Sequence, residues 1–346
     1  MIIGIDTSNY TTSLAAVENG VIVSDRRRLL VVKEGERGLR QQEALFQHVN
    51  NLPELYRELV SDIGDGHVDA VSCSVRPRPV EGSYMPVFMA GRSFADVIAA
   101  TLGVPLYEFS HQEGHAEAAA KGTSLEGEES YVFFHLSGGT TEAVSLPEYE
   151  LCGRTLDISF GQLIDRCGVA LGMKFPCGKE MDGLALSSDQ SSSNGHMFTG
   201  ADYLTYSKHM SITGADVDDS ARQYHIDLPH VKVENGEVNL SGIESACQRL
   251  IRGEHAFDKT EFCRALFDSI ADALWRMVLS IKEKTGQDRF LFAGGVSSSL
   301  YIRERLREKC EECGGKVLIE FGEPGLCRDN AVGTALLGEK LWRLNQ

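Results

Sequence analysis

The sequence predicts an α/β protein built from two related halves that face each other across a central cleft. Strand and helix patterns alternate along the chain, and a pattern of strand, polar turn and strand occurs near the N-terminus and again in the middle of the chain. The 346 residues suffice for about two domains, yet no linker rich in proline or glycine divides them. The two halves are therefore expected to share one cleft.

The first half contains five expected strands and two helices. Apolar residues at helical spacing predict a helix from Leu45 to Ile63, and Pro86 and Gly103 bracket a second helix over Phe88–Leu102. The strands are expected at Ile2–Thr7, Ser13–Val17, Val21–Val32, Val68–Val75 and Val104–Phe109. We assign residues 1–110 to this half and expect the terminal helix, residues 330–346, to complete it.

The second half, residues 111–329, repeats the pattern. Its central feature is a long helix over Thr260–Lys284, with Thr260 as the expected N-cap and Gly286 after its end. A polar insertion is expected around residues 187–258, with Ser191–Gly195 as a mobile loop. Strands are expected at Tyr131–Leu136, Glu142–Leu146, Arg289–Ala293 and Val317–Phe321, followed by a terminal helix at Asn330–Leu344.

The two polar turns are rich in hydroxyl groups and backbone N–H groups. One is the segment 8–12, and the other is Ser137-Gly138-Gly139-Thr140-Thr141. Two such turns on facing halves can hold a polyphosphate from both sides. This duplicated design predicts the actin-like architecture that Hsp70 proteins and sugar kinases share.

Composition excludes several classes of function. The chain carries 34 Lys and Arg against 50 Asp and Glu, a formal charge of -16, so its field disfavours DNA. An RNA substrate would need a basic partner, although Arg26–Arg28 and the pair Arg76 and Arg78 are candidate basic patches. The sequence has no apolar run long enough to span a membrane. Nine cysteines and an N-terminus that resembles a strand predict a reduced cytoplasmic protein.

Two histidines are spaced for metal binding. On a helix, His111 and His115 would lie on one face and could chelate one ion. The order H-x-E-x-H differs from the H-E-x-x-H of zinc peptidases and places Glu113 on another face, which weakens a peptidase interpretation. A pair of surface histidines is the alternative. Cys310 and Cys313 form a lone C-x-x-C without a second ligand pair.

Several short motifs together resemble the threonylcarbamoyladenosine synthase family, formerly called O-sialoglycoprotein endopeptidase. They occur in the family's order and spacing: His111–His115, Ser137–Thr141, Ala293-Gly294-Gly295-Val296-Ser297 and Cys327-Arg328-Asp329-Asn330. The resemblance implies the actin-like fold and a metal held by His111, His115 and Asp329. It also implies an adenine nucleotide in the cleft and transfer of a carbamoyl-threonyl group to a tRNA adenosine, assisted by partner proteins.

The chain also departs from the family's motifs. The family's T-S-C-D-E-T is replaced by Thr7-Ser8-Asn9-Tyr10-Thr11-Thr12, which lacks both carboxylates. Thr140 replaces the histidine of S-G-G-H-T, Ser299 replaces a terminal asparagine, and Glu244 replaces the lysine of S-G-L-K. The glycine-rich G-P-G-L-V-G becomes Arg76-Pro77-Arg78-Pro79-Val80-Glu81. These changes indicate a divergent family member with altered acceptor-side groups.

The leading hypothesis is a carbamoyl-transfer enzyme that binds one divalent metal ion, iron or zinc, and an adenine nucleotide, either ATP, AMP or a carbamoyl-adenylate. The alternatives are a catalytically weak nucleotide-binding paralogue that regulates a partner and, less favoured, a metallopeptidase. Asp6 and Glu113 are the catalytic candidates. The expected nucleotide or substrate residues are Ser137, Gly138, Gly139, Thr140, Asp165, Gly178, Gly294, Gly295 and Ser299.

Overall fold

The structure is a computed structural model of the chain, and it describes residues 1–8, 10–32, 39–191, 226–253 and 257–346. Its first half is built on a mixed sheet with the strands β1 (Ile2–Thr7), β2 (Thr11–Glu18), β3 (Val21–Leu29), β4 (Ala70–Arg76) and β5 (Leu106–Ser110). They lie in the order β3-β2-β1-β4-β5. The first three strands pair antiparallel, whereas β4 and β5 join parallel to β1.

The second half repeats this topology. Its strands are β6 (Val132–Leu136), β7 (Thr141–Ser145), β8 (Glu150–Thr155), β9 (Val233–Glu234), β10 (Glu237–Val238), β11 (Arg289–Ala293) and β12 (Leu318–Phe321). The order β12-β11-β6-β7-β8 mirrors that of the first sheet, and β10 and β9 extend the edge beyond β8. Three antiparallel strands followed by two parallel strands in each half confirm the predicted duplication.

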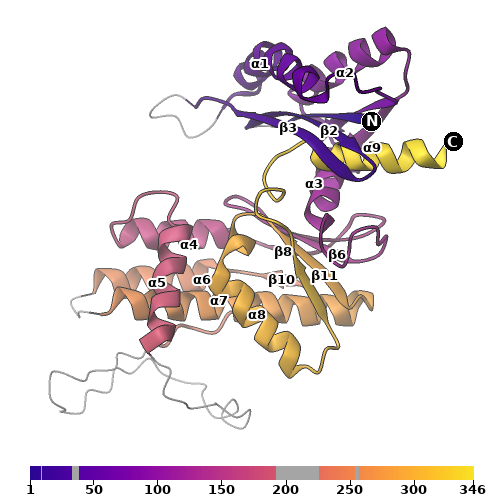
Figure 1. Cartoon of the computed structure of the whole chain (residues 1–346). Helices are drawn as coiled ribbons and strands as arrows, with labels where there is room; N and C mark the ends of the chain where they lie inside the picture. Colours follow the sequence, from indigo (N-terminus) through magenta and orange to yellow (C-terminus); the bar gives the residue numbers. More distant parts are fainter. Residues whose placement is uncertain (9, 33–38, 192–225, 254–256) are drawn as a thin grey trace, which may run out of the picture.

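Helices cover both sheets (Figure 1). They are α1 (Gln41–Ile63), α2 (Phe88–Leu102), α3 (His111–Ala120), α4 (Phe160–Ala170), α5 (Gly178–Ser191), α6 (Ser241–Arg252), α7 (Lys259–Thr285), α8 (Leu300–Glu312) and α9 (Val332–Leu344), with a 3-10 turn at Val296–Ser298. Leucines of α1 and alanines of α2 pack against Ile3 and Ile5 on one face of the first sheet. On the second sheet, the largest core cluster contains residues of β6 and β11 and of the helices α4, α5, α6, α7 and α8.

Helix α3 joins the two halves. Its Ala118 packs with α9 and β2, whereas Ala116 and Ala119 pack with β6 and β11 of the second sheet. Figure 1 shows α3 descending from the first sheet to the second, beside α9. The helices approach so closely that a Cβ on Gly333 would lie 1.8 Å from the carbonyl oxygen of Gly114. This contact requires glycine and fixes α3 between the two sheets.

The sequence-based assignments hold with local differences. Asp258, and not Thr260, is the N-cap of α7, because its side chain accepts a hydrogen bond from the Thr260 amide at 2.7 Å. The expected mobile loop lies outside the described residues beyond Ser191. The division of the halves between residues 110 and 111 remains a prediction. In the described part of the chain, no helix is both long and apolar enough to cross a membrane.

Candidate functional site

The two predicted metal ligands lie in the first turns of α3. Ser110 caps this helix, and the Glu113 side chain accepts a hydrogen bond from the Ser110 amide at 2.6 Å. The helical spacing brings the Nε2 atoms of His111 and His115 within 2.9 Å of each other. Asp329, in the segment before α9, places its Oδ1 at 3.6 Å from the His111 Nε2 and 3.3 Å from the His115 Nε2.

The resulting cluster has the donor set of a metal centre. The ligand atoms of His111, His115 and Asp329 all lie within 4.8 Å of one another. Two imidazoles and one carboxylate match the donor set of 2-His-1-carboxylate sites, which leave coordination positions open for substrate. The folded chain therefore brings together the three residues that the family resemblance implied.

Asp6 and Ser8 hold these ligands in place. Asp6, at the end of β1, accepts a hydrogen bond from the His111 Nδ1 at 2.8 Å, and its other oxygen accepts from the Ser8 amide at 3.1 Å. The Ser8 hydroxyl donates to the Asp329 Oδ2 at 2.8 Å. A carboxylate on Nδ1 selects the tautomer whose Nε2 lone pair is free for a metal. Asp6, which was predicted as a catalytic candidate, thus contacts one of the predicted metal ligands, and its catalytic role stays a prediction.

Electrostatics in the cluster favour a cation. Burial alone would lower the pKa of His111, but the carboxylates of Asp6 and Asp329 outweigh it and raise this pKa to about 10. Burial opposes ionisation of Asp329, but hydrogen bonds and positive charge from the two histidines hold its pKa well below the usual range. In the absence of a metal, the cluster therefore binds a proton where a metal cation would be held.

The Glu113 side chain forms part of the cap at the start of α3. As the residue three positions after the N-cap, it closes a capping box with Ser110. Its carboxylate therefore satisfies an amide at the helix start. This contact removes the base that a peptidase mechanism would need at the H-x-E-x-H motif.

Two further histidines lie near the cluster, and sequence reasoning missed both. His48, fully buried on α1, donates from Nε2 to the Ser8 carbonyl at 2.7 Å and accepts from the Thr12 hydroxyl at 2.8 Å. The ring of His135, on β6, lies 5.1 Å from the His115 ring, centroid to centroid. Burial lowers the pKa of His135 to about 3. No short motif surrounds either residue, so only the fold reveals them.

The second half contributes the predicted polar turn between β6 and β7. The Ser137 amide donates to the Thr140 carbonyl at 2.9 Å, and the Ser137 hydroxyl accepts from the Thr140 amide at 3.0 Å. Gly161 of α4 packs beneath this turn, since a Cβ there would lie 2.5 Å from the Cα of Gly138. A Cβ added to Gly138 or Gly139 would meet no atom within 4 Å, so the surface of these two residues is open.

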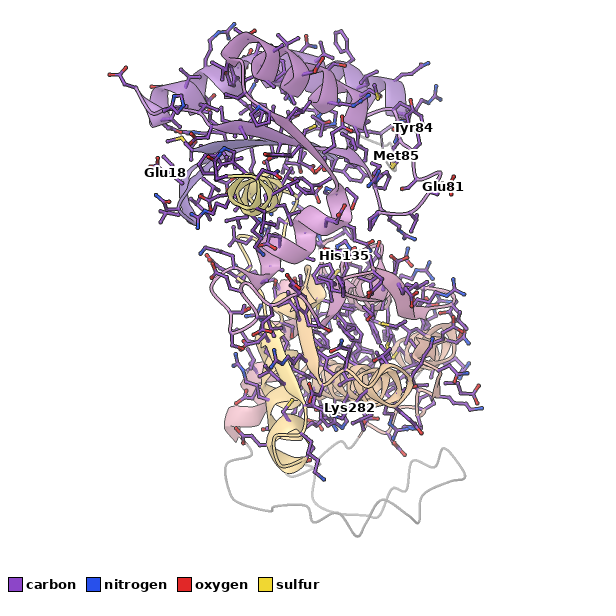
Figure 2. All side chains as sticks on the ribbon, turned by 90° about the vertical axis from the view of Figure 1, so that its right-hand side faces the viewer. Glu18, Glu81, Tyr84, Met85, His135 and Lys282 are labelled. Atoms are coloured by element: carbon purple, nitrogen blue, oxygen red, sulfur yellow. The ribbon has the colours of Figure 1, made fainter. Side chains whose placement is uncertain are left out.

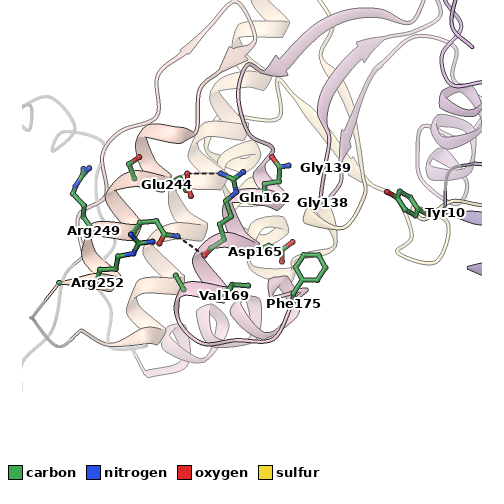
Figure 3. A pocket seen from close by; sticks show the side chains of 15 residues that line it. Tyr10, Gly138, Gly139, Gln162, Asp165, Val169, Phe175, Glu244, Arg249 and Arg252 are labelled. Carbon is green, nitrogen blue, oxygen red and sulfur yellow. Dashed lines mark hydrogen bonds and ion pairs between the residues drawn. The ribbon is translucent and has the colours of Figure 1, made fainter. Parts of the chain in front are cut away.

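A pocket of about 1360 Å³ begins at this turn and continues along α4 and α6 (Figure 3). Gly138, Gly139 and Asp165 line it, and the Asp165 Oδ1 accepts from the Cys177 amide at 2.8 Å. Tyr10 borders it from the first half. Its far end is basic, with the exposed arginines Arg166, Arg249 and Arg252.

The remaining predicted site residues lie outside this lining. Gly294 has a φ of +103°, and a Cβ there would lie 2.4 Å from the Leu136 carbonyl oxygen, so it serves close packing of β11 against β6. Gly295 is open, and Gly178 begins α5. The Ser299 hydroxyl caps α8 and donates to Asp182 at 2.5 Å. The assignment of these residues to the nucleotide remains a prediction.

Comparisons with known proteins agree with these features. A sequence profile of the family described as tRNA N6-adenosine threonylcarbamoyltransferase matches residues 33–336. A relative of that description from Neorickettsia sennetsu is 26% identical over 96% of this chain and 90% of its own length. One from Thermotoga neapolitana is 24% identical over 97% of this chain and 93% of its own length. A probable bifunctional tRNA threonylcarbamoyladenosine biosynthesis protein of Methanothermobacter thermautotrophicus is 25% identical, and the match spans 56% of that protein.

Solved structures establish the fold class. A ROK hexokinase from Thermus thermophilus superposes with a TM-score of 0.52 at 12% identity, over 98% of this chain and 99% of that one. The HypF protein of T. kodakarensis superposes with a TM-score of 0.50 at 13% identity, over 99% of this chain and 47% of that one. The predicted actin-like fold is confirmed. The chain belongs to the tRNA N6-adenosine threonylcarbamoyltransferase family, and the predicted class of enzyme, a threonylcarbamoyl or carbamoyl transferase, is confirmed with it.

Proposed function

We propose that this protein transfers a threonylcarbamoyl group, or a related carbamoyl group, from an adenylate donor to the N6 amine of an adenosine in tRNA. The observation that carries the proposal is the three-residue cluster His111, His115 and Asp329 in a chain of this family, with an open glycine turn on the facing half. A cation at the cluster and an adenylate on the turn would meet across the cleft.

The metal site fits a divalent ion of the iron or zinc type. Two imidazole nitrogens and a carboxylate oxygen suit both ions, and the Asp6 contact on His111 supplies the outer support that such ligands need. When bound, the ion would supply Lewis-acid stabilisation of negative charge on phosphate or carbamate oxygens. The chain's own contribution is to fix ligand orientation through Asp6 and Ser8.

The nucleotide would lie in the pocket of the second half. Gly138, Gly139 and Asp165 line this pocket, and we propose that the glycine N–H groups would bind phosphate oxygens while Asp165 would bind the ribose or base. The pocket of about 1360 Å³ exceeds the roughly 300–1,000 Å³ that small-molecule sites occupy, so it has room beyond a mononucleotide.

In the proposed reaction, the N6 amine of adenosine attacks the carbamoyl carbon. The bond from that carbon to the adenylate oxygen breaks, the adenylate leaves with the electron pair, and the amine loses one proton. Positioning and charge stabilisation carry most of such a step. Tyr10 and Thr140 stand where the family has a carboxylate and a histidine, so the proton would pass to the leaving phosphate or to water.

The acceptor would need help to reach an acidic protein. A formal charge of -16 opposes tRNA, whereas Arg166, Arg249 and Arg252 offer local positive charge at the pocket's outer end. Arg166 is partly neutralised by Glu244 at 3.5 Å. We therefore propose that basic partner subunits assist tRNA binding, in the cytoplasm, with neither DNA nor a membrane as partner.

Reconstitution tests this function. The protein, a carbamoyl-adenylate-forming enzyme, partner subunits and tRNA are incubated, and the nucleosides are analysed. We expect modified adenosine, formed at least tenfold more slowly than by a family member that retains the carboxylates and the histidine. Loss of acid–base assistance costs about 10²–10⁴ in rate, so a tenfold deficit is a conservative expectation. No product under any partner combination would contradict the proposal.

A regulatory paralogue is the second candidate. The departures at Tyr10 and Thr140 favour it, because a partner that only binds nucleotide needs neither acid nor base. In that case, the protein would bind AMP and would change the rate of a true synthase, while forming no product itself. The same reconstitution separates the two functions.

A further inference from the structure

Arg76 is a charged side chain that the proposed function does not yet use. It is the last residue of β4, and its Nε is buried without a hydrogen-bond partner. Its guanidinium forms no ion pair with any residue that the structure describes. Arg76 is half-buried, and a buried N–H donor such as its Nε costs free energy when it has no partner.

The position of Arg76 is set by the neighbouring strand. Arg76 pairs with Ser110 of β5, the residue directly before the metal-ligating turn of α3. The next residue, Pro77, accepts a hydrogen bond from the Gln112 amide at 3.0 Å. The end of β4 is thus attached to the first turn of α3, beside His111.

The same segment reaches the second half. Arg78 donates to Glu142 of β7 at 2.6 Å, directly after the polar turn 137–141. Figure 2 shows the following loop, with Glu81, Tyr84 and Met85 labelled, at the margin of the first half above the second half, where His135 is labelled. Residues 76–78 therefore span the cleft between the metal cluster and the glycine turn.

The acidic groups of this region are already engaged. Asp6 binds His111, Glu113 binds the Ser110 amide, Glu142 binds Arg78, and Asp329 binds Ser8 and the two histidines. Arg76 has no counterion among them. The described chain therefore leaves the Arg76 guanidinium open to an anionic ligand.

We propose that Arg76 binds the carboxylate of the acyl group that the enzyme transfers. This inference rests on the proposed function, in which the donor joins an adenylate to an amino-acid-derived carbamoyl group. The phosphate has its own donors at Gly138 and Gly139, whereas a threonylcarbamoyl group carries a second anion, its carboxylate. Arginine matches a carboxylate with two parallel hydrogen bonds. The family has glycine at this position, so the contact would be particular to this chain.

Calorimetry with two matched ligands tests the proposal. One is a non-hydrolysable threonylcarbamoyl adenylate analogue, and the other is the same molecule with hydrogen in place of the carboxylate. We expect Arg76→Ala to weaken binding of the carboxylate ligand at least tenfold and binding of the second ligand less than twofold. Arg76→Lys should lose less affinity for the carboxylate ligand than Arg76→Ala does. Arg92→Ala, which removes an exposed arginine paired with Glu108, is the control and should change neither.

Thermal unfolding adds a readout that separates binding from a structural role. Removal of an unpaired, partly buried guanidinium should leave the Tm of Arg76→Ala unchanged or higher, whereas a structural residue would lower it. Equal losses for both ligands, or no loss for the carboxylate ligand, would overturn the proposal while leaving the proposed function intact. If the wild-type protein bound neither AMP nor the analogues, the proposed function and this inference would both be wrong.

Discussion

Replacement of Asp6 by asparagine is expected to weaken metal binding while leaving all three ligands in place. Asp6 is 1% exposed and accepts hydrogen bonds from both the His111 Nδ1 and the Ser8 amide. An asparagine has one acceptor oxygen for these two donors. If that oxygen stays on Ser8, the amide N–H₂ faces the His111 Nδ1 and forces the proton onto Nε2, the nitrogen that should bind the metal.

The expected loss is 10- to 100-fold in metal affinity, or about 1.4–2.7 kcal/mol, the range found for outer-sphere partners of metal-binding histidines. A neutral residue also lowers the proton affinity of His111, whose pKa Asp6 helps to raise to about 10. This reduces competition from protons. The electrostatic attraction of the Asp6 carboxylate for a divalent ion is about twice its attraction for a proton. Exchange of the proton for the metal is therefore still more favourable in the wild type than in Asp6→Asn.

Titration with Zn²⁺ and Fe²⁺ at fixed pH gives the affinities, and circular dichroism confirms folding. Asp62→Asn, which removes a carboxylate paired with Arg26 on the outer face of α1, is the matched control and should bind metal as the wild type does. His111→Ala should abolish specific binding. If Asp6→Asn bound metal within threefold of the wild type, the assigned role of Asp6 would be refuted.

Three further outcomes are expected. Gly139→Val should fold normally, because a Cβ there meets no atom within 4 Å. It should bind AMP about tenfold more weakly in calorimetry, which corresponds to about 1.4 kcal/mol. An unchanged affinity for AMP would exclude the turn from the nucleotide site. Arg249→Ala and Arg252→Ala should each weaken tRNA binding and lower its salt dependence by about one charge, whereas Arg154→Ala should not. Burial lowers the pKa of His48, so as the pH falls below about 6.5 the unfolded chain takes up a proton at this residue before the native protein does. The wild type should therefore lose, through this residue, up to about 1.4 kcal/mol of unfolding free energy per pH unit below that value. The stability gap to His48→Gln should narrow between pH 7.5 and 5.5 in urea unfolding, and a constant gap would contradict this.

The sequence was informative wherever local chemistry decides structure. The hydroxyl-rich turns, the i, i+4 histidines and the glycines after β11 each carry their geometry in a few adjacent residues, so the fold class and the proximity of the two histidine rings could be predicted. Asp329 was implied by the family resemblance alone, because its approach to α3 depends on how the halves join. The capping box that Glu113 closes with Ser110 was not anticipated from the sequence, and a catalytic role for Glu113 stays a prediction.

Longer-range features could not be predicted. His48 contacts Ser8 and Thr12 only because α1 packs against the first sheet, and no motif marks that contact. The unpartnered Nε of Arg76 is likewise a property of the folded strand end, although the sequence had marked Arg76 as part of a basic patch. Register and packing determine such contacts, whereas residue type only permits them.

The two ends of the cleft, the metal cluster and the first turn with the segment 76–81, have diverged to different extents. At the metal end, His111, His115 and Asp329 and their supports remain together. At the acyl end, the sequence has lost the carboxylates of the family's first turn and gained Arg76 and Arg78 in place of glycines. Arg78 is neutralised by Glu142, but Arg76 is not paired within the described chain. Loss of the two carboxylates and gain of Arg76 make the potential beside the first turn more positive, whereas Glu81 and Glu244, in place of a glycine and a lysine, act in the opposite direction further along the chain. An acyl group with a firmly bound carboxylate is the substrate that such a change favours, and it also explains how orientation by Arg76 could offset part of the lost acid–base assistance.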